Sequence, residues 1–161
     1  MNKISTILFL FLSIITNGQN KNLVVKEIDS IVNRIDSICV SGGVEDYTIE
    51  IKKGSKKQFG DGADWFYTDS TKTKLLKVFS EYSIGTQNIE LYYFHQNSLI
   101  YLKIINFTYD NNTKNINWEG QYYFQDNKLI FKQDKLKKDL KPEIYLEKAT
   151  HFFGSDKIWR I

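Results

Sequence analysis

The chain has 161 residues, one cysteine, and a nearly balanced charge of 22 Lys and Arg against 19 Asp and Glu. The charged residues are interleaved rather than gathered in blocks, which argues against a nucleic-acid-binding protein. Cys39 cannot form a disulfide within the chain, so stability in an oxidising compartment would depend on packing, for which the 15% of aromatic residues supply apolar surface.

The amino-terminal segment has the layout of an export signal. Lys3 precedes an apolar run at residues 4–15, which is shorter than the roughly 20 residues that a membrane-spanning helix needs. A polar segment follows, in which Thr16 and Gly18 are small, so we expect cleavage near Gly18 or Gln19. An uncleaved amino-terminal anchor is the alternative.

These features predict how the chain is divided and where it works. We expect a signal peptide at residues 1–19 and a single domain at residues 20–161, because that length supports one core rather than two. The expected location is secreted or periplasmic. After cleavage we expect no stable insertion into a membrane.

The segment LVVKEIDSIVNRIDSICV, residues 23–40, predicts a helix. Its apolar residues recur every three or four positions, which is the period of one helix face, and Gly42 and Gly43 can end it. The tetrapeptide IDSI occurs twice, seven residues apart, so a coiled coil is the alternative to one helix packed on a sheet. On a sheet, Cys39 would be a buried apolar residue rather than a nucleophile.

From Tyr47 onward the hydrophobic period changes to two and the chain reads as successive hairpins. The segment YYFHQNSLIY, residues 92–101, returns as YYFQDNKLIF, residues 122–131, with six of ten positions identical. Asn97 and Asn127 take the same place in the two turns, because asparagine tolerates positive φ. A looser copy, DWFYTDSTKTKLLKVF, precedes both.

Hairpins joined in sequence predict an α+β fold. We expect a twisted antiparallel meander of about six or seven strands, with an N-terminal helix and a C-terminal helix packed on it. Pro142 suits the first turn of the second helix, and Gly154 would end it. Residues 157–161 could form a last short strand or a packed tail.

The repeated hairpin resembles one known group of proteins. The aromatic strand, short turn and K-L-I run, found after a helix and an export signal, are similar to a recurrent group of small secreted bacterial proteins without assigned function. The resemblance covers roughly residues 64–131. It implies export and this fold, and it supplies no catalytic residue.

Aromatic residues at consecutive positions of both repeats, 92–94 and 122–124, suggest a binding surface. Consecutive strand residues point to opposite faces, so both faces of the sheet carry tyrosine. If the helices cover one face, one tyrosine of each pair stays exposed on the other, where tyrosine is favoured at interfaces. The alternative is that these rings pack beneath loops. The candidate binding residues are Tyr92, Tyr93, Tyr122 and Tyr123.

No motif of a known enzyme, metal site or cofactor site occurs in the sequence. The acidic segment GDGAD, residues 60–64, lacks the alternating ligands of a calcium loop, and we expect it to be a turn. We therefore expect no catalytic residue, no metal and no cofactor. If the chain is nevertheless an enzyme, the site would be built from Asp61, Asp64 and His95.

Two functions follow from this reading. The preferred one is an exported, non-enzymatic binding protein of the cell envelope, inhibitor-like, immunity-like or ligand-binding, whose partner is a protein or a glycan. The alternative is a small secreted hydrolase or lyase with an unrecognised site. A structural component of the envelope would differ from the first only in having a permanent partner.

Overall fold

The computed structural model describes residues 3–53, 55–134 and 141–154 and has the predicted α+β architecture. It contains seven antiparallel strands in one sheet, with a helix before them and a helix after them. The elements in chain order are α1 (Lys3–Ile38), β1 (Val40–Lys53), β2 (Lys56–Thr68), β3 (Leu75–Ile84), β4 (Thr86–His95), β5 (Ser98–Asp110), β6 (Thr113–Gln125), β7 (Lys128–Asp134) and α2 (Pro142–Gly154).

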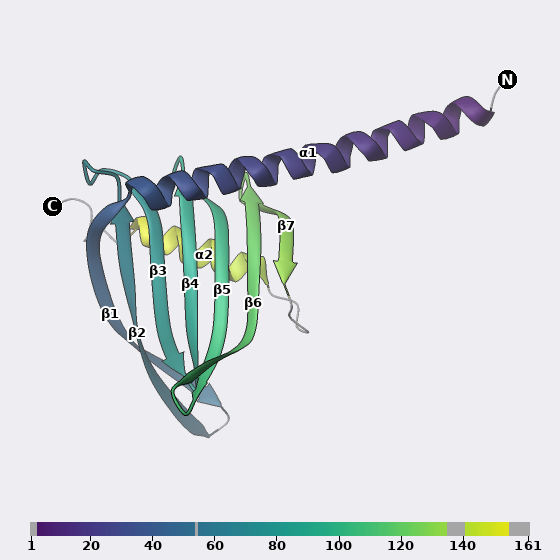
Figure 1. Ribbon diagram of the computed structural model, residues 1–161. Coiled ribbons are helices and arrows are strands. Elements are labelled where there is room, and N and C mark those ends of the chain that lie inside the picture. Colours follow the sequence, from purple (N-terminus) through teal and green to yellow (C-terminus); the bar gives the residue numbers. More distant parts are fainter. Residues whose placement is uncertain (1–2, 54, 135–140, 155–161) are drawn as a thin grey trace.

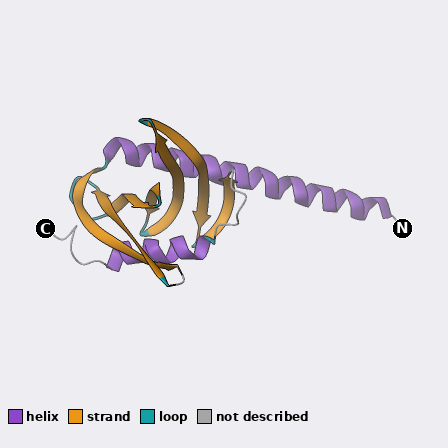
Figure 2. Ribbon diagram, turned by 90° about the horizontal axis from the view of Figure 1, so that it is seen from below, coloured by secondary structure: helices purple, strands orange, loops and turns teal. Residues whose placement is uncertain are grey.

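The sheet is a meander in which each strand pairs with the next along the chain, so β1 and β7 are its edges. It is strongly curved, and the two helices lie on opposite faces of it (Figures 1 and 2). Figure 1 shows α1 crossing one end of the strands while α2 lies behind them. The chain therefore has three layers, helix, sheet and helix, whereas an exposed tyrosine surface was predicted for the case in which the helices cover one face.

Each face of the sheet carries its own apolar core. The core beneath α2, here called the α2-side core, is centred on Tyr92, Phe94 and Leu102 of the sheet and Phe152 of the helix. The core beneath α1 forms from Ile28 and Ile35 of the helix with three tyrosines of the sheet. Because consecutive strand residues face opposite ways, Tyr92 enters the first core and its neighbour Tyr93 the second.

The repeated turns have the predicted left-handed asparagines. Asn97 has φ 61° and Asn127 has φ 58°, and the residues before them, Gln96 and Asp126, both have φ 51°. Positive φ at two central residues is the mark of a type I′ turn, whose twist matches that of the flanking strands. Only two residues therefore separate the strands of each hairpin, fewer than the four residues that separate the apolar runs in the sequence.

The first helix is longer than its amphipathic segment. It ends at Ile38, so Gly42 and Gly43, which were predicted to end it, lie within β1 instead. It begins at Lys3 and thus includes the predicted export signal. Its amino-terminal part extends beyond the sheet, past β7 (Figure 1). No helix within the described ranges is both long enough and apolar enough to span a membrane. Within the chain, α1 packs as a single helix on the sheet.

The second helix begins at Pro142 as predicted, and Ala149 and Phe152 of α2 pack into the core beneath it. Residues 157–161, for which a strand or a packed tail was predicted, lie outside the described residues. Cys39 is partly buried beside the core beneath α1, as expected of a small apolar residue.

Candidate functional site

The predicted tyrosine surface is not exposed. Tyr92 and Tyr122 are 0% and 1% exposed beneath α2, and Tyr93 and Tyr123 are 4% and 5% exposed beneath α1. The prediction of an open aromatic face was wrong in this respect, because the two helices cover opposite faces instead of sharing one. None of the four hydroxyls depends on water alone, since each donates a hydrogen bond to a protein carboxylate.

The residues considered for catalysis are not brought together. The GDGAD segment is part of β2 rather than a turn, and Asp61 and Asp64 are three positions apart, so they point to opposite faces. Asp64 lies opposite Ser80, which lies opposite Glu90. His95 is five residues beyond Glu90 on β4, which places it roughly 17 Å further along the strand direction. His95 and Asp64 are therefore too far apart to act on the same group of a substrate.

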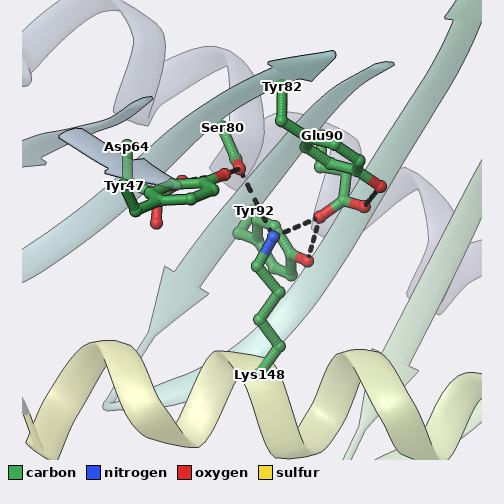
Figure 3. A network of polar contacts seen from close by, with 7 residues as sticks. All are labelled: Tyr47, Asp64, Ser80, Tyr82, Glu90, Tyr92 and Lys148. Atoms are coloured by element: carbon green, nitrogen blue, oxygen red, sulfur yellow. Dashed lines mark hydrogen bonds and ion pairs between the residues drawn. The ribbon is translucent and has the colours of Figure 1, made fainter. Parts of the chain in front are cut away.

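A different polar cluster lies on the α2 side of the sheet, around the buried carboxylate of Glu90 (Figure 3). Tyr82 donates its hydroxyl to Oε1 at 2.8 Å, and Tyr92 donates to Oε2 at 2.6 Å. The ammonium of Lys148, which comes from α2, lies 2.8 Å from the same Oε2. Glu90 is only 2% exposed, so these donors replace water as its hydrogen-bonding partners.

Lys148 links the second helix to the sheet. Besides its ion pair with Glu90, its Nζ donates to Oγ of Ser80 at 3.3 Å. The ammonium also lies 5.4 Å from the ring centre of Tyr82 and 5.5 Å from that of Tyr92, within the range of cation–π attraction. The Lys148 ammonium therefore attaches α2 to the sheet through a carboxylate, a hydroxyl and two aromatic rings.

A second carboxylate, Asp64, lies beside this group. The hydroxyl of Tyr47 is 3.4 Å from its Oδ1 and 3.1 Å from Oγ of Ser80. Burial raises the pKa of Asp64, and the hydrogen bond from Ser80 and the charge of Lys148 oppose that rise only in part. Burial also raises the pKa of Tyr47 to about 12, so its hydroxyl remains a hydrogen-bond donor at neutral pH.

Gly62 makes room for the ring of Tyr47. A Cβ at this position would lie 2.8 Å from two carbons of that ring and 2.6 Å from Cβ of Tyr82. Both distances are too short for any side chain without a shift of the neighbouring strands. The glycine that suggested a turn in the sequence is thus required by close packing between β1 and β3 across β2.

An open cavity of about 640 Å³ lies between this cluster and α2, and we call it the α2-side cavity. Ionisable groups from both the sheet and the helix reach it, namely Glu45, Asp64, Lys148 and His151. Its apolar and aromatic lining consists of Tyr47, Ile49, Phe66, Tyr82 and Phe152.

A larger cavity of about 960 Å³ lies between α2 and the hairpin turns. Its described lining contains one ionisable side chain, Lys72, and one aromatic side chain, Phe153, among hydroxyl, amide and aliphatic groups. The smaller cavity is the better candidate site in spite of its size, because convergent polar groups against aromatic walls are what fix and orient a ligand. Among the described residues, no group of three potential ligands could hold a metal ion.

Comparison with protein-family models, with curated proteins and with solved structures finds no match for this chain. The resemblance to small secreted bacterial proteins therefore stays a prediction. The site described above rests on the geometry of this chain alone.

Sequence reasoning missed most of this site. It grouped Asp64 with Asp61 and His95, and it did not select Tyr47, Tyr82, Glu90 or Lys148. One signal was present: Glu90 shares a strand face with Tyr92 and Phe94, so an acidic residue was placed on a face rich in aromatic side chains. An ionisable residue at such a position requires a partner, and that partner belongs to a helix 58 residues away in the sequence.

Proposed function

We propose that this protein is an exported, non-enzymatic binding protein of the cell envelope, and that its ligand is a glycan fragment held in the α2-side cavity. The observation that carries the proposal is the convergence of hydrogen-bonding groups from β1, β2 and α2 on one aromatic-walled cavity of about 640 Å³. The export signal predicted at residues 1–19 supports the location.

The mixture of groups favours a polyhydroxyl ligand. Each sugar hydroxyl both donates and accepts hydrogen bonds, so a site for it needs both kinds of group. Asp64 and Glu45 accept, whereas Lys148 and Tyr47 can donate. The ring of Tyr82 offers a flat apolar surface on which the C–H face of a sugar ring can pack.

The state of Glu90 argues against a catalytic role for that carboxylate. Hydrolysis of a glycosidic bond needs two carboxyl groups that both reach the substrate. Asp64 and Glu45 both line the cavity, so two carboxyl groups are within reach of a ligand, whereas both oxygens of Glu90 already accept hydrogen bonds from Tyr82, Tyr92 and Lys148. With 2% of its surface exposed, Glu90 organises the site instead of contacting a ligand.

The proposal is tested by calorimetric titration of residues 20–161 with soluble oligosaccharides released from envelope polysaccharides. We expect Asp64→Asn to weaken binding by about tenfold or more, because a hydrogen bond to a charged group contributes roughly 1.5–3 kcal/mol. Asp61→Asn is the matched control, since Asp61 lines a separate cavity on the sheet.

Three results would contradict the proposal. One is the absence of binding to any envelope oligosaccharide, and another is equal weakening by the Asp64 and Asp61 variants. The third is recovery of a shortened oligosaccharide after incubation, because it would support the hydrolase alternative. Chromatography of the recovered sugar measures this last point directly.

A further inference from the structure

The edge strand β1 offers a long surface for pairing. It has 14 residues, against 7 in the opposite edge strand β7. Among the described residues, β1 pairs with β2 on one side and with no strand on the other. The free backbone groups of such an edge form a ready template for another strand.

The sequence of β1 is complementary to itself in one antiparallel register, the one centred on Ile49. About a two-fold axis there, residues of the two copies that face each other lie on the same side of the sheet. Asp46 then meets Lys52 of the other copy, which has the opposite charge, on one face. Aromatic or β-branched residues meet on the other face, and both kinds of cross-strand pair are favourable. The facing pairs are Asp46 with Lys52, Tyr47 with Ile51, Thr48 with Glu50, and Ile49 with its own copy.

The neighbouring registers that keep the faces aligned are unfavourable. Centring the pairing on Thr48 places Asp46 opposite Glu50, and centring it on Glu50 places that carboxylate opposite its own copy. Like charges directly opposite each other destabilise a strand pair. The charges of β1 therefore favour the register centred on Ile49 over these two neighbours, whereas charges that merely protect an edge need not complement one another.

Exposed apolar surface lies at the same edge. Ile51 is 44% exposed on the face that carries Tyr47, and pairing with a second copy would cover part of it. Tyr47 and Ile49 also line the α2-side cavity. We infer that the chain forms a symmetric dimer in which two copies pair antiparallel through β1, centred on Ile49, and join their sheets into one. The two cavities then lie on either side of the seam.

Charge exchange tests the inference. Sedimentation velocity of residues 20–161 over a wide concentration range should show a dimer. Either Lys52→Glu or Asp46→Lys alone should weaken dimerisation by about tenfold or more, because two like-charge pairs per dimer replace two attractive ones. The double variant Asp46→Lys/Lys52→Glu restores opposite charges in the same register and should dimerise again.

Lys74→Glu is the control, because it makes the same change of charge in the exposed loop before β3 and should leave the dimer intact. Circular dichroism verifies that each variant is folded. A wild-type chain that stays monomeric at every concentration would overturn the inference. So would a double variant as dissociated as the two single ones, since rescue depends on residues 46 and 52 facing each other.

Discussion

At the scale of single residues, Glu90 and Lys148 decide whether α2 can lie on the sheet. Glu90 is buried with three hydrogen-bond donors, and one of these carries the positive charge that balances it. A buried ion pair stabilises little compared with an apolar pair of the same shape, but loss of one partner leaves an uncompensated charge. We therefore expect the pair to act chiefly by making other packings of α2 unfavourable.

We predict that Lys148→Met destabilises the domain by about 3 kcal/mol, because Glu90 then remains buried without a cation. Methionine keeps the apolar stem, so the effect reports the charge rather than lost packing. Urea unfolding at neutral pH measures it. Glu90→Gln/Lys148→Met should recover part of the loss, and a single variant within about 0.5 kcal/mol of wild type would contradict the role given to this pair.

The buried tyrosines make stability depend on alkaline pH. Burial, mainly, raises the pKa of both Tyr93 and Tyr123 to about 12, above the value near 10 of an unfolded chain. The folded state therefore holds these protons more tightly. Their contribution to stability is complete below pH 10 and is lost as the pH rises towards 12.

The expected result is a fall of the urea midpoint as the pH rises above about 10. A double Tyr93→Phe/Tyr123→Phe variant should be less stable at pH 8, because Asp36 and Asp29 lose their hydroxyl donors. Its stability should also decline less steeply with pH. Equal slopes for the two proteins would show that these hydroxyls do not titrate as proposed.

At the scale of elements, periodicity predicted the architecture well. A period of three to four residues gave the packed part of α1, alternation gave the hairpins, and the paired asparagines gave the positive φ at residues 97 and 127. It did not predict that the helices would take opposite faces. The consecutive aromatics at 92–94 and 122–124 carried that information, because a strand with large apolar residues on both faces is usually buried on both.

The contacts of α1 predict the effect of removing the expected export signal. The α1 residues that pack on the sheet begin at Val24 and include Ile28 and Ile35, all after the expected cleavage point. The free energy of unfolding of residues 20–161 should therefore lie within about 0.5 kcal/mol of that of the full chain, as expected for changes outside the core. Chemical denaturation of both forms measures this. A large loss of stability would show that the first nineteen residues belong to the domain.

At the scale of the whole molecule, the candidate site comes from strand register and helix placement rather than from any local motif. Asp64, Ser80 and Glu90 lie side by side because three successive strands align them, and Tyr47 reaches them from β1 across Gly62. Lys148 joins them from α2 (Figure 3). Spacing along the sequence could not have shown which of these residues meet, since they are spread over four strands, β1 to β4, and the helix α2.

Amide chemical-shift mapping shows directly whether a ligand binds in the α2-side cavity. Envelope oligosaccharides would be titrated into ¹⁵N-labelled protein of residues 20–161. We expect the largest amide chemical-shift changes at Tyr47, Asp64 and Lys148. Shifts that gather instead around Asp61 or the hairpin turns, or no shifts with any oligosaccharide, would contradict it.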